Sequence, residues 1–292
     1  GPDLSAARFG PVATVLPTGR VLIAGGDLAG TADLFDAAEG GFVATGIPLP
    51  DGVRVLATGT LLSDGRVLLA GGTTIVFTPL PAAQTLATTA IFDPKTRAFT
   101  AGPALRAPRA SHAAVRLPDG RVLITGGVGR SDTEVIDAAA MESVAGPPLT
   151  GVRDDHAATL LPDGRVLVTG GQDATGRSLA SAEVLDPGAT SFRPLAASMG
   201  SRRADHEALR LPGGGVLILG GEDDPADGSP DAILDTVEWF DPATETFLPL
   251  PALAVPRDDH RAARLADGGI LVTGGEDETS TSIAAVEVYR PR

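Results

Sequence analysis

The stretch Leu16-Pro-Thr-Gly-Arg-Val-Leu-Ile-Ala-Gly-Gly26 recurs five more times along the chain in closely similar form. A self-similar unit of roughly 50 residues is typical of repeat architectures, which include propellers. The sequence therefore predicts six structural units of one kind. The five counterparts end at Gly72, Gly127, Gly171, Gly221 and Gly275.

In every unit an arginine stands seventeen residues before the first glycine of the closing pair. Because this interval never changes, the segment tolerates no insertion, as expected of a tight hairpin that is buried on both faces. We assign it to the first two strands of each unit. The six arginines are Arg8, Arg54, Arg109, Arg153, Arg203 and Arg257.

The predicted hairpin pairs an apolar strand such as Ala113-Ala-Val-Arg-Leu117 with a β-branched strand such as Val166-Leu-Val-Thr169. The turn between them is Asp-Gly in four units. Asp-Gly supplies the positive φ of a two-residue hairpin turn, so we expect a loop of that length. The glycine pair after the second strand lets neighbouring backbones pass closely.

A third strand is predicted after each glycine pair, and a fourth follows in five units, for example Thr246-Phe-Leu-Pro-Leu250. Four short antiparallel strands make one propeller blade. We therefore predict an all-β fold, a single six-bladed β-propeller domain over residues 1–292. The third strands are expected at 32–36, 89–93, 133–137, 182–186, 237–241 and 286–289, within blades at 8–50, 54–105, 109–150, 153–199, 203–254 and 257–292.

Residues 1–7 are predicted to close the ring against blade six, because the sequence after the third strand of that blade ends at Arg292. Such closure shields an open sheet edge. Pro2 lies six residues before Arg8, and the same interval separates a proline from its arginine in four other units. Those prolines are Pro48, Pro103, Pro147 and Pro251.

The formal net charge of −14 argues against nucleic acid as a partner, because phosphate backbones are bound by clustered lysine and arginine. A basic partner or a cation is favoured instead. No apolar run approaches the roughly 20 residues that span a bilayer, so we expect no membrane insertion.

The chain has no cysteine, which excludes disulfides, thiolate metal sites and cysteine nucleophiles. We expect a monomer located in the periplasm or outside the cell, although a cytoplasmic location stays open.

Three sequence elements together resemble kelch repeats, especially the bacterial form found in the central domain of galactose oxidase. They are Arg-x-x-His, Asp-Gly-Arg-Val-Leu-x-x-Gly-Gly and Ala-Glu-Val-x-Asp-Pro. Kelch propellers serve as enzymes, glycan-binding modules and protein-docking platforms. The resemblance implies two tyrosines and a cysteine for copper radical oxidase activity, and this chain has only Tyr289 and no cysteine. That activity is rejected, whereas chemistry like that of the six-bladed sialic acid epimerase stays open.

The variable loops after the glycine pairs are expected beside the arginines, because the first strand leaves that face and the second returns to it. The longest of these loops are 73–88, 222–235 and 276–282. Loops on a rigid scaffold usually carry binding specificity.

All four histidines occupy one repeat position, three residues after an arginine, and aspartate precedes three of them. One interpretation is a ring of imidazoles, guanidinium groups and carboxylates that holds a polar or anionic ligand at the channel mouth. The other is a hydrogen-bonded scaffold surrounded by solvated charge. The residues are His112, His156, His206 and His260, with Asp155, Asp205 and Asp259.

The third strands carry a recurrent glutamate, which we interpret as a structural partner of the arginine and not as one of the paired carboxylates of a glycoside hydrolase. These residues are Glu134, Glu183, Glu238 and Glu287.

The loops Glu222-Asp-Asp-Pro-Ala-Asp-Gly-Ser-Pro-Asp231 and Glu276-Asp-Glu278 are rich in oxygen ligands of the kind that calcium prefers. Their spacing does not match an EF-hand, so we assign no metal ligand and expect no cofactor.

No common catalytic motif occurs. We predict a non-enzymatic module that binds a protein or a glycan. The alternative is a carbohydrate-active enzyme of the epimerase or lyase kind that uses a histidine and a carboxylate as acid and base.

Overall fold

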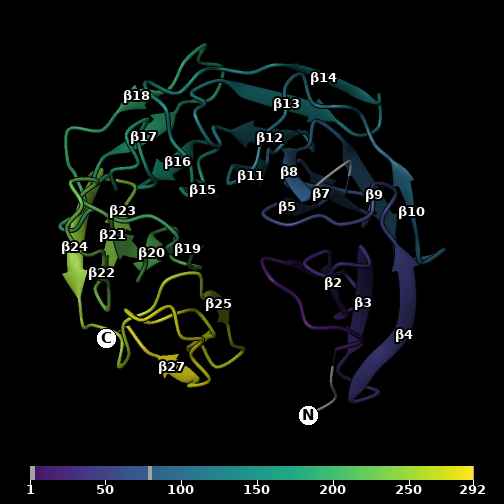
Figure 1. The fold of residues 1–292 in the computed structure, drawn as a ribbon. Helices are drawn as coiled ribbons and strands as arrows, with labels where there is room; N and C mark the ends of the chain where they lie inside the picture. Colours follow the sequence, from purple (N-terminus) through teal and green to yellow (C-terminus); the bar gives the residue numbers. More distant parts are fainter. Residues whose placement is uncertain (1–3, 78–80, 292) are drawn as a thin grey trace. The chain divides into compact units, whose positions relative to one another are not determined.

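A computed structural model describes residues 4–77 and 81–291 and shows an all-β, six-bladed β-propeller built from small antiparallel sheets (Figure 1). This confirms the predicted fold class. None of the described residues forms a helix that is long and apolar enough to cross a membrane.

By their internal contacts these residues form two compact units, which are described separately. Unit 1 comprises Gly1–Thr125 and Thr133–Gly146, and unit 2 comprises Gly126–Asp132 and Pro147–Arg292.

Unit 1 contains three sheets of four strands and a separate hairpin. The sheet orders are β1-β2-β3-β4, β10-β9-β6-β5 and β11-β12-β13-β14, and the hairpin is β7-β8. The strands are β1 Val12–Val15, β2 Val21–Ala24, β3 Thr31–Asp36, β4 Gly41–Pro48, β5 Thr58–Leu61, β6 Val67–Ala70, β7 Thr73–Phe77, β8 Pro81–Thr85, β9 Thr89–Asp93, β10 Ala98–Ala101, β11 Ala113–Arg116, β12 Val122–Thr125, β13 Thr133–Asp137 and β14 Glu142–Ala145.

Unit 2 contains two sheets of four strands, one of three and a two-stranded hairpin. Their orders are β15-β16-β17-β18, β19-β20-β23-β24, β25-β26-β27 and β21-β22. The strands are β15 Ala157–Leu160, β16 Val166–Thr169, β17 Ala182–Leu185, β18 Arg193–Pro194, β19 Glu207–Arg210, β20 Val216–Leu219, β21 Glu222–Asp223, β22 Ala232–Ile233, β23 Val237–Asp241, β24 Thr246–Leu250, β25 Arg261–Arg264, β26 Ile270–Thr273 and β27 Glu287–Tyr289.

In four of the six sheets the second strand along the chain is buried throughout, because it lies between two strands of its own sheet. Every residue of β6, β12, β16 and β20 is buried. The first strand is more exposed than predicted, since in β25 only one of four residues is even half-buried. The predicted burial on both faces of the hairpin therefore holds for the second strand in four sheets and not for the first strand.

The hairpin turn contains three residues, not the predicted two. In β11-β12 the N–H of Leu117 donates to the carbonyl of Arg121, and the N–H of Gly120 donates to that of Leu117. Of the central residues only Gly120 has positive φ, at 90°. A type I turn followed by a glycine in the left-handed region gives this geometry, and it uses the same Asp-Gly dipeptide.

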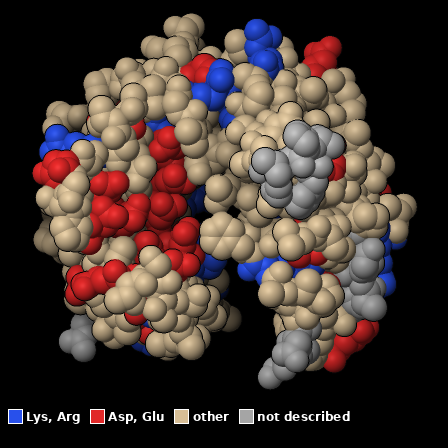
Figure 2. Space-filling model, in the orientation of Figure 1, with Lys and Arg blue, Asp and Glu red and all other residues tan. Residues whose placement is uncertain are grey.

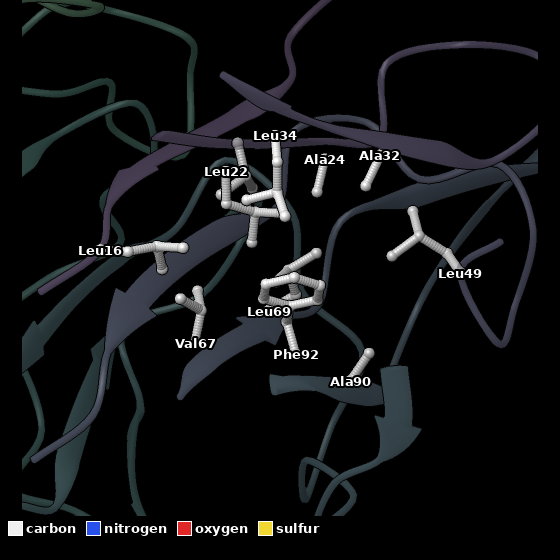
Figure 3. Packing of buried hydrophobic residues seen from close by; sticks show 11 residues of the cluster. Leu16, Leu22, Ala24, Ala32, Leu34, Leu49, Val67, Leu69, Ala90 and Phe92 are labelled. Carbon is white, nitrogen blue, oxygen red and sulfur yellow. The ribbon is translucent and has the colours of Figure 1, made fainter. Parts of the chain in front are cut away.

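Apolar side chains from neighbouring sheets form the core within each unit. Figure 3 shows one cluster in unit 1, in which Leu22 and Leu34 of the first sheet face Leu69 and Phe92 of the second. A corresponding cluster in unit 2 joins Val184 of β17 to Phe240 of β23. Small aliphatic residues pack in layers here, as the low aromatic content of 4% requires.

The predicted closing segment falls partly outside the described residues, which exclude 1–3. Residues 4–7 form no strand, and the Ser5 hydroxyl donates to Asp33 Oδ2 at 2.8 Å in the first sheet. Among the described residues the sixth sheet has three strands.

Candidate functional site

In five blades the guanidinium group of the repeat arginine donates to the carbonyl of the first glycine of the closing pair, from Arg8, Arg54, Arg153, Arg203 and Arg257. Arg203 Nη1 donates to the Gly220 carbonyl at 2.6 Å, and its Nη2 donates to Glu238 Oε1 at 2.7 Å. Arg203 and Arg257 have no exposed surface. The six arginines therefore serve the scaffold, and the ligand contact predicted for them stays a prediction.

The recurrent glutamates of the third strands are the ionic partners of these arginines, as predicted. The N–O distances are 2.6 Å for Arg109–Glu134, 2.8 Å for Arg153–Glu183, 2.7 Å for Arg203–Glu238 and 3.4 Å for Arg257–Glu287. Blades one and two use Asp33 and Asp51 instead. A buried charge of one sign is thus matched by one of the other, which a low-dielectric interior requires.

The four histidines are buried, and they support the backbone. The His206 Nε2 atom lies 2.9 Å from the Thr169 hydroxyl of the preceding blade. A Cβ on Gly220 would lie 2.8 Å from His260 Cε1, so this glycine leaves room for the ring. Burial lowers the pKa of His112 and of His260 to about 3, which keeps both rings neutral. This arrangement matches the scaffold interpretation, and ligand binding by the histidines stays a prediction.

The residue two positions after each arginine adopts left-handed backbone geometry in all six blades. In unit 2 this residue is aspartate three times, and backbone hydrogen bonds connect the three. The Asp205 N–H donates to the Asp155 carbonyl at 3.0 Å, and the Asp259 N–H donates to the Asp205 carbonyl at 3.2 Å. Aspartate tolerates this geometry better than most residues. The φ values are 54° at Gly10, Leu56 and Ser111, 48° at Asp155, 49° at Asp205 and 46° at Asp259.

The residue directly after each glycine pair lies beside this line of aspartates. Backbone bridges pair Gln172 with Asp154, Glu222 with Ala204, and Glu276 with Asp258. The long loops are thereby placed next to the arginine-bearing connections, which confirms their predicted position.

We call seven carboxylates of unit 2 the acidic face. Figure 2 shows acidic side chains gathered over unit 2. Sequence reasoning missed Asp154, Glu222 and Asp258 as site residues, although constant spacing from the arginine would have identified them. The acidic face comprises Asp154, Asp155, Asp205, Glu222, Asp258, Asp259 and Glu276.

Burial and repulsion from neighbouring carboxylates make ionisation of Asp205, Glu222 and Asp258 costly. Burial, then the charges of Asp155 and Asp259, raise the pKa of Asp205 well above its usual range. Burial and the charge of Asp258 raise the pKa of Glu222 to about 7. Burial and the charge of Asp259 raise the pKa of Asp258 to about 6. The acidic face therefore changes its charge near neutral pH.

Within residues 4–77 and 81–291, Asp205 and Asp259 form no ion pair with a protein cation. The same residues contain no group of three or more histidine, aspartate or glutamate side chains arranged to hold a metal ion. Calcium binding at the acidic loops therefore stays a prediction without assigned ligands.

The chain matches no protein-family model and no curated protein. Among solved structures it is similar to YjhT, at 13% identity and a TM-score of 0.81, covering 97% of this chain and 95% of that one. It is also similar to a fungal alcohol oxidase of the AA5 family solved with copper, at 21% identity and a TM-score of 0.74. That match covers 94% of this chain and 59% of the oxidase. These likenesses support a propeller like those of kelch proteins and galactose oxidase.

Replacing Arg203 by methionine is expected to destabilise the protein by about 3–5 kcal/mol, because the variant leaves Glu238 as an uncompensated buried charge. Arg210→Met, at an exposed position of the same blade, is the control and should change stability by less than about 0.5 kcal/mol. Denaturant unfolding measures both. Equal effects of the two substitutions would refute the scaffold role of Arg203.

The raised pKa of Glu222 predicts that the free energy of unfolding decreases as the pH rises. The folded-state pKa of Glu222, about 7, lies above the ordinary value of 4.5. The contribution of this carboxyl to the free energy of unfolding is therefore fully present below pH 4.5 and is lost as the pH rises through 7. Glu222→Gln should remove about 1 kcal/mol of this decline, as measured by denaturant unfolding between pH 5 and 8. Glu278→Gln, in an exposed loop, should leave the decline as in the unmodified protein. An unchanged slope in Glu222→Gln would contradict the assignment.

Proposed function

We propose that this protein is a non-enzymatic recognition module whose acidic face binds lysine and arginine side chains of a partner protein. The observation that carries the proposal is the hydrogen-bonded line of Asp155, Asp205 and Asp259. It fixes the backbone of three aspartates on adjoining blades.

The backbone geometry favours binding over mere solvation of charge. Each aspartate is followed by a buried histidine and preceded by a buried arginine two residues earlier, so its main chain is fixed at both sides. Fixed carboxylates lose little conformational entropy when they meet a cationic side chain.

The electrostatics favour a cationic partner. Burial and repulsion from neighbouring carboxylates raise the pKa values of Asp205 and Glu222, and a bound lysine or arginine would relieve that repulsion. Complementary charge also raises association rates and excludes wrong partners. A protein with a basic surface fits this pattern better than an uncharged glycan, which remains the other ligand class for such a module.

We propose further that the module is monomeric and works in the periplasm or outside the cell. The support for this location is the absence of cysteine and the bacterial character of the repeats.

A carbohydrate-active enzyme is the alternative, and one observation favours it. Groups that exchange protons near neutral pH are suited to acid–base catalysis, and Glu222 and Asp258 have pKa values of about 7 and 6. The histidines are poor candidates for this work, because burial holds their protons away from solvent. Epimerisation of N-acetylneuraminic acid, followed by NMR, tests the alternative. Turnover that Glu222→Gln abolishes would establish it in place of the binding module.

The binding proposal predicts that Asp155→Asn combined with Asp259→Asn weakens binding of a fluorescent decalysine peptide about tenfold at low ionic strength. Asparagine keeps the shape of aspartate and tolerates left-handed geometry, so the change removes charge alone. Fluorescence anisotropy gives the dissociation constants.

The control removes the same net charge elsewhere, with Glu39→Gln and Glu142→Gln at exposed positions of unit 1. This variant should bind the peptide within about twofold of the unmodified protein. If both pairs of substitutions weaken binding equally, attraction depends on net charge and the acidic face is not the site.

A further inference from the structure

A polar pocket of about 650 Å³ lies between blades four and five of unit 2, a volume typical of small-molecule sites. It is bounded by the β15-β16, β19-β20 and β23-β24 turns. These turns lie at the ends of the two sheets that are opposite the glycine pairs, because β16 and β20 run from the turns to the glycine pairs and β23 runs back. The pocket is therefore separate from the acidic face.

The β23-β24 turn, which forms one wall of the pocket, is held by arginines of blade four. Arg165 Nη1 and Arg193 Nη2 both donate to Glu245 Oε1, the second at 2.6 Å. Arg165 Nη2 also donates to the Pro242 carbonyl at 2.6 Å, so one guanidinium group fixes both ends of the turn. The Glu245 carboxylate is thus positioned before any ligand arrives.

Asp163 is a second carboxylate at the pocket, and its own turn fixes it. Its Oδ1 accepts from the Arg165 N–H at 3.1 Å, and its Oδ2 accepts from Arg165 Nε at 2.7 Å. The Asp163 side chain is still 49% exposed, and that of Glu245 is 28% exposed. Hydrogen bonds from Arg165 and Arg193 lower the pKa of Asp163 and of Glu245, respectively. Both groups therefore stay ionised and can accept further hydrogen bonds at neutral pH.

This set of groups favours a neutral ligand that is rich in hydroxyl groups. The Nε, Nη1 and Nη2 atoms of Arg165 already donate to protein oxygen atoms, so an anionic ligand would have to break one of these bonds. Arginines already neutralise both carboxylates, so a cationic ligand would gain little. Hydroxyl groups can donate to the remaining lone pairs of Asp163 and Glu245. The rings of Pro162 and Pro242 add apolar surface for the C–H groups of a sugar.

The turn of blade five is unusual, and its sequence leaves room for a ligand. It reads Gly213-Gly214-Gly215, without the aspartate and arginine of the other turns. A Cβ on Gly213 would meet no atom of the described residues within 4 Å, whereas a Cβ on Gly215 would collide with the Trp239 indole. Space is therefore open beside Gly213. The Asp-Gly-Arg turns of blades two, three and four are 64–66, 119–121 and 163–165.

We propose that this pocket binds a neutral sugar, about the size of a disaccharide, as part of a glycan. The sugar hydroxyl groups donate to Asp163 and Glu245, and the two prolines pack against the apolar side of the ring. The proposal goes beyond the binding of basic proteins and does not depend on the acidic face, which lies at the other end of the sheets.

The probes are four neutral disaccharides: lactose, maltose, cellobiose and sucrose. Saturation-transfer difference NMR on the complete chain is expected to show saturable binding of at least one of them. Inorganic phosphate and the decalysine peptide should not compete. Amide hydrogen exchange at residues 242–245 should slow when the bound disaccharide is added.

Asp163→Asn should weaken disaccharide binding about tenfold, the loss expected for one hydrogen bond to a charged group. Asp119→Asn is the matched control, because Asp119 occupies the same turn position in blade three and accepts the same two bonds from Arg121. It should leave the affinity unchanged. Matching thermal unfolding curves will show that both variants fold.

Gly213→Tyr should abolish disaccharide binding, because its ring fills the open space of the pocket. The variant is expected to fold, since Gly213 does not have the positive φ that favours glycine. Thr18→Tyr places the same ring at the corresponding exposed turn position of blade one and should bind normally. The Asp155→Asn and Asp259→Asn variant should also bind normally, which separates this site from the acidic face.

Three outcomes overturn the proposal. The first is the absence of saturable binding by all four disaccharides. The second is binding that Gly213→Tyr leaves intact or that Asp163→Asn and Asp119→Asn weaken equally. The third is binding that the Asp155→Asn and Asp259→Asn variant loses, since the sugar then occupies the acidic face.

Discussion

The buried bond between each repeat arginine and the first glycine of its blade is the interaction on which the rest of this structure depends. Arg203 reaches the Gly220 carbonyl, and the N–H of the next glycine, Gly221, donates to the Arg257 carbonyl at 2.9 Å. Each arginine thus holds its own hairpin through its side chain and the preceding one through its main chain. An inserted residue would break both contacts, which explains the constant interval of seventeen residues.

This scaffold also determines which polar residues face solvent. The arginines are buried because they donate to backbone carbonyls, and the histidines are buried because their rings fill space beside glycine. The residue between them is forced into left-handed geometry and stays accessible, so its identity varies freely among Gly10, Leu56, Ser111 and the three aspartates. Burial and the charges of Asp155 and Asp259 raise the pKa of Asp205, the middle one of the three aspartates.

Most of the fold could be predicted from the sequence, because hairpin spacing, glycine pairs and the Arg–Glu pairing all repeat. The turn type could not be predicted, since Asp-Gly serves both two-residue and three-residue loops. The sequence left two roles open for Arg203 and His260, ligand binding or support of the scaffold, because repetition marks a polar residue as important without stating where it points. Glu222 was missed since it belongs to a loop of variable length, although a backbone bridge to Ala204 fixes its position. The organisation as one domain stays a prediction.

The acidic face of unit 2 acts through charge, which salt screens over about 8 Å at physiological ionic strength and which protonation reduces near pH 6–7. Salt and protonation act on the same carboxylates, so the attraction of this face for a cationic side chain depends on ionic strength and pH together.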